Sequence, residues 1–146
     1  MFPMNNLSIK QSFRVLRQKW LSLIMGQLIA LIFFGMMMRS PLHRTRPLPI
    51  LAALSVALLI ALVPAAYVVR IKFFRAGQMG GGISFPAYST GNFIFWLACE
   101  IVSFFGLIVA LLTGSFWPTI VVTAIAIALQ AITAPVATKI GEYPKS

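Results

Sequence analysis

The most constraining feature of this chain is a set of four apolar segments, each close to the length that crosses a lipid bilayer. They cover 20–38, 50–69, 93–112 and 117–137. A helix needs roughly 20 residues, rising 1.5 Å each, to cross about 30 Å of hydrocarbon. Inside lipid the backbone must close its own hydrogen bonds, and runs this continuous are not the alternating strands of a barrel. The sequence therefore predicts an all-α integral membrane protein, a four-transmembrane-helix bundle.

Composition supports a single membrane domain over 1–146. Hydrophobic residues make up 60% of the chain and charged residues only 10%, more apolar surface than a water-soluble core could hide. Twelve Lys and Arg face two acidic residues, for a formal net charge of +10. Because these basic residues flank the apolar runs, we expect a bilayer with anionic lipids as their partner and no nucleic acid.

The distribution of Lys and Arg predicts the orientation, since positive side chains are retained on the cytoplasmic side. With four crossings, the N-terminal arm, the connection between the second and third runs, and the tail share one side. These segments hold nine basic residues against three on the opposite side. We therefore expect a multi-pass protein of a cell (plasma or inner) membrane with both termini cytoplasmic. The nine are Lys10, Arg14, Arg17, Lys19, Arg70, Lys72, Arg75, Lys139 and Lys145; the three are Arg39, Arg44 and Arg46.

The arm 1–19 is basic and amphipathic. Its apolar residues recur at helical spacing through Ile9, Phe13 and Leu16 to Trp20, beside a basic stripe. This pattern predicts a short N-terminal amphipathic interfacial helix on an anionic membrane surface, and it equally fits a simple topogenic anchor. The residues expected to contact lipid headgroups are Lys10, Arg14, Arg17, Lys19, Arg70, Lys72 and Arg75.

A glycine-rich cytoplasmic connection is predicted over 70–92. It lacks the Gly-Lys-Ser/Thr ending of a phosphate-binding loop, because Gly82 is followed by Ile83 and Ser84. We interpret the glycines as a flexible or re-entrant connection.

Small residues at four-residue spacing predict where helices pack, because lipid supplies no hydrophobic drive for association and close backbone approach must replace it. Each apolar run carries such a stripe. The stripes are Gly26 and Ala30; Ala53, Ala57, Ala61 and Ala65; Cys99, Ser103, Gly106 and Ala110; and Ala124 and Ala128.

Glu100 is the one ionisable residue within the four runs. A charge at that depth costs about 2.5 kcal/mol or more, so we expect the carboxyl to carry a proton. Counting residues from the run ends places Gln27 and Gln130 at a similar depth, which predicts an intramembrane polar cluster of Glu100, Gln27 and Gln130. Two interpretations stay open: a hydrogen-bonded cluster that sets helix register, and a group that binds and releases a proton or cation.

The stretch from Glu100 through Phe104, Phe105 and Gly106 to Leu112 resembles the second helix of the ATP synthase c subunit. In that family an ion-carrying glutamate precedes an aromatic residue, a glycine and an aliphatic run. The resemblance implies only that Glu100 binds a proton. The rest of the chain departs from the two-helix hairpin with a glycine-rich first helix, so we interpret the likeness as convergent.

Catalytic chemistry is not expected. The chain has a single His, His43, a single Cys, Cys99, and two Glu, too few for an ordinary metal site, a catalytic triad or a carboxylate pair. We therefore predict no enzyme activity and no cofactor or metal. Two functions remain: a structural or accessory subunit packed in a larger membrane assembly, with another membrane protein or a second copy as partner, or a small proton- or cation-coupled transporter or channel that uses Glu100 as an oligomer.

The predicted topology has a direct test. Reporter fusions at Ser146 and within the connection 41–49 should lie on opposite sides of the membrane, because an odd number of crossings separates one site from the other. Compartment-specific enzyme reporters measure this. The same side for both fusions would contradict the four-crossing assignment.

Overall fold

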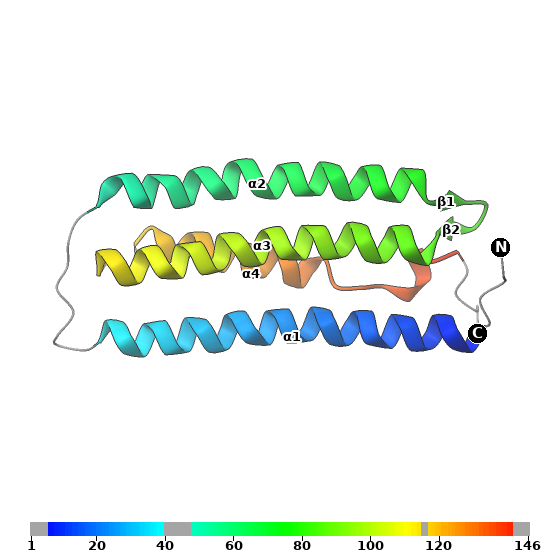
Figure 1. Cartoon of the computed structure of the whole chain (residues 1–146), viewed down its shortest axis with the longest axis horizontal. Coiled ribbons are helices and arrows are strands. Elements are labelled where there is room, and N and C mark those ends of the chain that lie inside the picture. Colours follow the sequence, from blue (N-terminus) through cyan, green and yellow to red (C-terminus); the bar gives the residue numbers. More distant parts are fainter. Residues whose placement is uncertain (1–5, 40–47, 115–116, 142–146) are drawn as a thin grey trace.

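The computed structural model describes residues 6–39, 48–114 and 117–141. Within these ranges four helices alternate in direction along one axis (Figure 1). Their bounds are α1 Asn6–Met38, α2 Pro49–Ala76, α3 Phe85–Thr113 and α4 Thr119–Ile132; a short hairpin of β1 Gln78–Met79 and β2 Gly82–Ile83 joins α2 to α3, and a 3-10 turn, η1, covers Ala137–Lys139. Three of the helices are long and apolar enough to cross a membrane, and α4 is a shorter apolar helix.

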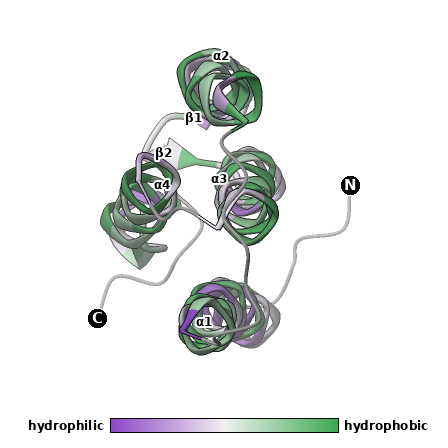
Figure 2. Ribbon diagram, turned by 90° about the vertical axis from the view of Figure 1, so that its left-hand side faces the viewer, coloured by the Kyte–Doolittle hydropathy of each residue, from purple (hydrophilic) through white to green (hydrophobic). Residues whose placement is uncertain are grey.

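Helix α3 occupies the centre of the bundle and contacts all three other helices. Viewed along the axis, α3 and α4 lie side by side between α2 and α1, and α1 stands furthest from α2 (Figure 2). The start of α1, the hairpin and η1 lie at the same end of the bundle (Figure 1). This end, called the basic end below, carries the described residues Lys10, Arg14, Arg17, Lys19, Arg70, Lys72, Arg75 and Lys139.

The predicted short interfacial helix is not a separate element. Helix α1 runs unbroken from Asn6 to Met38, because no proline or glycine interrupts the sequence between Asn6 and Trp20. Ile9 is 2% exposed and Leu16 is 5% exposed. Its apolar stripe therefore packs against protein, while the neighbouring basic stripe is exposed.

The connection expected over 70–92 is also different. Helix α2 continues to Ala76 and α3 begins at Phe85, since basic residues form helix well even where hydropathy falls. The turn between them is tight and needs glycine. Gly82 has a φ of 156°, and a side chain there would lie 2.5 Å from the Gly141 nitrogen. That nitrogen donates to the Ile83 carbonyl at 3.1 Å, which ties the end of the described chain to the hairpin.

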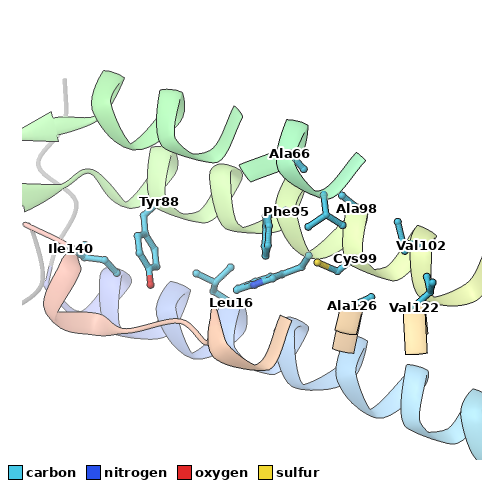
Figure 3. Packing of buried hydrophobic residues seen from close by; sticks show 12 residues of the cluster. Leu16, Ala66, Tyr88, Phe95, Ala98, Cys99, Val102, Val122, Ala126 and Ile140 are labelled. Carbon is cyan, nitrogen blue, oxygen red and sulfur yellow. The ribbon is translucent and has the colours of Figure 1, made fainter. Parts of the chain in front are cut away.

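The core follows one face of α3. Its predicted small stripe is buried along its whole length, and so are the large side chains of Phe95 and Trp96. The buried cluster joins Phe95 and Cys99 of α3 with Leu16 of α1 and Ala126 of α4 (Figure 3). The stripes on the other helices do not form the contacts inside the bundle. Residues 53, 57, 61 and 65 of α2, 124 and 128 of α4, and Gly26 of α1 are exposed. Helix α2 instead buries Ser55, Val63, Ala66 and Arg70, and α4 buries Thr119, Val122, Thr123, Ala126 and Gln130.

The fourth apolar run is helical only over Thr119–Ile132. Pro135 lacks a backbone N–H, its ring would collide with the carbonyl four residues earlier, and it disfavours helical angles at the residue before it, which together favour a helix end ahead of it. The segment 134–136 that follows has no regular structure. At 1.5 Å per residue, the 14 residues of α4 extend only about 21 Å.

A substitution at Gly106 tests how closely α3 and α4 pack. A Cβ there would lie 2.8 Å from Thr123 Oγ1 and 3.3 Å from the Thr119 carbonyl, so Gly106→Val should lower the free energy of unfolding by about 1–3 kcal/mol. Gly26→Val is the matched control, because nothing lies within 4 Å of a Cβ at Gly26. Unfolding of the detergent-solubilised protein measures both; equal effects would exclude close packing at Gly106.

Candidate functional site

The candidate site surrounds the point where α4 ends inside the bundle. A helix end leaves backbone carbonyls without partners inside the helix, and neighbouring side chains can satisfy them. Two indoles provide donors. Trp20 Nε1 of α1 donates to the Gln130 carbonyl at 2.9 Å, and Trp96 Nε1 of α3 donates to Thr133 Oγ1 at 3.2 Å. The Thr133 hydroxyl in turn donates to the Leu129 carbonyl at 2.9 Å.

The chain beyond α4 is held by the same side of the bundle. The Val136 backbone N–H donates to the Tyr88 hydroxyl of α3 at 2.8 Å. Tyr88 is 1% exposed. Trp20, Trp96 and Tyr88, from two helices, therefore hydrogen-bond to the end of α4 and to the irregular backbone after it.

Gln27 and Gln130 form the centre of the site. Gln27 Nε2 donates to Gln130 Oε1 at 2.6 Å, a bond between α1 and α4. Both side chains are fully buried, at 0% exposed. Gln27 Oε1 and Gln130 Nε2 have no hydrogen-bond partner in the described part of the chain. The pair therefore offers one further acceptor and one further donor in an enclosed, largely apolar interior.

Glu100 lies at the same level but outside this pair. It is one helical turn beyond Trp96, and Gln130 is about one turn before Thr133, the contact of Trp96. Among the described residues, no side-chain hydrogen bond joins the Glu100 carboxyl to either glutamine, so the three-residue cluster stays a prediction. Depth sets the level of a side chain and leaves its direction around the helix open.

The direction of Glu100 follows from its neighbours on α3. It is partly exposed, at the edge where the buried face turns into an exposed one. Leu97 and Phe93, one and two turns before it, are each 42% exposed, and Ile101 is 49% exposed. A sequence signal for this existed. The polar and small residues of α3 form one continuous stripe through Asn92, Cys99, Ser103 and Gly106, and Glu100 lies beside that stripe rather than in it.

The basic residues expected to contact headgroups divide into two groups. Arg70 is buried, at 8% exposed. The other six are exposed at the basic end: Lys10, Arg14, Arg17, Lys19, Lys72 and Arg75. A pocket of about 380 Å³ lies between α1 and the start of α3, and Lys19 is the one charged side chain that lines it.

Within the described ranges, no three His, Cys, Asp or Glu side chains gather where they could hold a metal ion. Cys99 is buried in the core, at 0% exposed, where a thiol packs as a small hydrophobe. His43 lies outside the described residues.

Comparison with known proteins found no family model, no curated protein and no solved structure that matches this chain. The residues themselves and their geometry are therefore what bears on function. Among the described residues, that geometry offers hydrogen bonding at the end of α4, a carboxyl at the edge of α3 and positive charge at one end.

The glutamine pair makes a testable prediction. Gln27→Leu and Gln130→Leu should each lower the free energy of unfolding by about 1–3 kcal/mol, because each strands the remaining buried amide. The double variant should lose about 1 kcal/mol less than the two single losses added together. Unfolding titrations of the wild type, the two single variants and the double variant in mixed micelles measure this double-mutant cycle.

Ser55→Ala serves as the control, since the Ser55 side chain bonds only to Ala52 of its own helix. The losses from Ser55→Ala and Gln27→Leu should therefore add in their double variant. Additivity in the glutamine cycle would contradict the coupling.

Proposed function

We propose that this protein is a multi-pass membrane subunit that packs in a larger membrane assembly through the open side of α3. Three crossings are supported by the lengths of α1, α2 and α3. A fourth is supported by α4 together with 134–136, because about 21 Å of helix and about 10 Å of extended chain add to the thickness of the hydrocarbon layer. The concentration of described Lys and Arg at the basic end favours a cytoplasmic location for that end.

The unsatisfied carboxyl of Glu100 carries this proposal. Glu100 is partly exposed beside Phe93, Leu97 and Ile101, all more than 40% exposed, and no hydrogen bond within the described chain reaches it. Facing lipid, an ionisable side chain at such depth is costly. A helix of another membrane protein that donates to or accepts from the protonated carboxyl would remove that cost, and the exposed rings and aliphatic groups around Glu100 would supply the packing.

The outer face of α2 supports the same function. Ala53, Ala57, Ala61 and Ala65 are exposed and recur every fourth residue. Such a stripe permits the close backbone approach by which membrane helices associate. Inside the bundle α2 uses other residues, so the stripe is free for a helix outside it.

The test compares two substitutions of Glu100. A photoreactive p-benzoylphenylalanine in place of Leu97 reports the partner as a covalent adduct in native membranes. Glu100→Gln should change the adduct yield by less than about twofold, because an amide still hydrogen-bonds. Glu100→Leu should lower the yield about three- to tenfold, the range expected for one lost interhelical hydrogen bond.

Ser22→Leu is the control for this experiment, because it removes an exposed polar group from α1, a different helix, and should leave the yield unchanged. A yield that is indifferent to Glu100→Leu would reject the proposal. Proton or cation flux through liposomes containing the wild-type protein, abolished by Glu100→Gln, would replace it with the transporter, because an amide cannot titrate.

A further inference from the structure

Arg70 differs from every other basic side chain that the structure describes. It lies near the end of α2, one residue beyond the apolar run 50–69, and is only 8% exposed. Lys72 and Arg75, on the same helix, are exposed. Arginine is rarely buried to this extent unless it is paired.

Aromatic rings enclose the guanidinium. Its Cζ lies 5.1 Å from the centre of the Phe74 ring of α2 and 5.4 Å from the centre of the Phe95 ring of α3. Phe74 in turn stacks on Tyr88, with the ring centres 5.4 Å apart and the planes 14° from parallel. Tyr88 holds Val136 by a hydrogen bond, so the frame around Arg70 is anchored to the site at the end of α4.

The rings stabilise the positive charge and leave the hydrogen-bonding capacity of the group unused. A guanidinium has five N–H donors lying in its plane, and ring faces do not accept them as an oxygen does. Arg70 Nε is enclosed without a partner, and no described residue accepts a hydrogen bond from Arg70. Nε is the one side-chain nitrogen of Arg70 that is both enclosed and without a partner. The two terminal nitrogens therefore contribute part of the 8% of Arg70 that is exposed.

Countercharge is also missing from the described chain. Its one acidic residue, Glu100, lies five residues beyond Phe95 on α3, about one and a half helical turns further from the basic end. A buried cation without a paired anion is strongly unfavourable. An anion with several acceptor oxygens would satisfy both the charge and the open donors.

We infer that Arg70, in its frame of Phe74, Phe95 and Tyr88, is a binding site for one phosphate group. A guanidinium fork matches the oxygens of a phosphate. Arg70 follows an apolar run of membrane-spanning length, the depth at which headgroup phosphates begin, and the exposed Lys72 and Arg75 raise the local concentration of anions. This site is separate from the α3 edge at Glu100 and does not depend on the proposed assembly.

Lipid titration of the full-length protein in detergent micelles tests the site. Dioleoyl phosphatidylglycerol is added in steps, and bound lipid is counted by native mass spectrometry. Arg70→Gln should weaken binding of the first lipid about tenfold, the loss expected for charge-assisted hydrogen bonds. Lys72→Gln removes the same charge from an exposed position of α2 and should weaken binding less than about threefold. A second arm adds inorganic phosphate at constant ionic strength.

Displacement of the lipid by millimolar phosphate in the wild type would support the site and identify free phosphate as its ligand, whereas resistance to displacement would support a lipid phosphodiester. Arg70→Lys keeps the charge and loses the planar fork; it should give an intermediate loss, and it replaces Arg70→Gln as the readout if that variant does not fold. Equal losses for Arg70→Gln and Lys72→Gln, or wild-type binding by Arg70→Gln or by a folded Arg70→Lys, would overturn the inference.

Discussion

The satisfaction of the backbone at the end of α4 is the constraint on which the rest of the structure depends. An apolar bundle has no water to take up the carbonyls that a helix end exposes. Trp20 and Trp96 donate to this end from α1 and α3, and Tyr88 accepts from the chain that follows. Trp20 of α1, together with Trp96 and Tyr88 of α3, is thereby required along the end of α4 and the segment that follows it, and these contacts set how α1, α3 and α4 align along the axis.

Helix α1 illustrates the consequence. Its contacts are made with α3 and α4 rather than with α2, and it stands at one side of the bundle (Figure 2). Its attachment combines the Trp20 and Gln27 hydrogen bonds with the burial of Leu16 and Ile9. Polar bonds give register and apolar burial gives contact area, so the helix is fixed in position despite having few neighbours.

Polar groups outside the helix end occupy three distinct environments. The glutamine pair is enclosed and hydrogen-bonded, Glu100 lies at an edge without a partner, and Arg70 is enclosed by rings without a countercharge. The glutamines bond to each other, although Gln27 Oε1 and Gln130 Nε2 have no partner among the described residues. The other two have unmet hydrogen-bonding capacity, and a buried or lipid-facing polar group without a partner is where an external one is expected. The proposed partner helix and the proposed phosphate would meet these two different demands.

Residue type and order alone determined the helices and the shared level of Gln27, Gln130 and Glu100, because apolar length and the rise per residue depend on the chain itself. The sequence also contains the signal that ends α4, Pro135, which follows the last helical residue, Ile132, although the apolar run extends past it. Only the tertiary structure decided which faces meet. The alanine stripe of α2 is exposed, Glu100 lies at the edge of the buried face of α3, and the small-residue stripe of α3 is buried. Small residues permit close approach without requiring it. Hydrogen bonds between helices, formed across more than a hundred residues of sequence in the case of Gln27 and Gln130, fix the facing sides of α1, α3 and α4, and the burial of Val63 and Ala66 fixes that of α2.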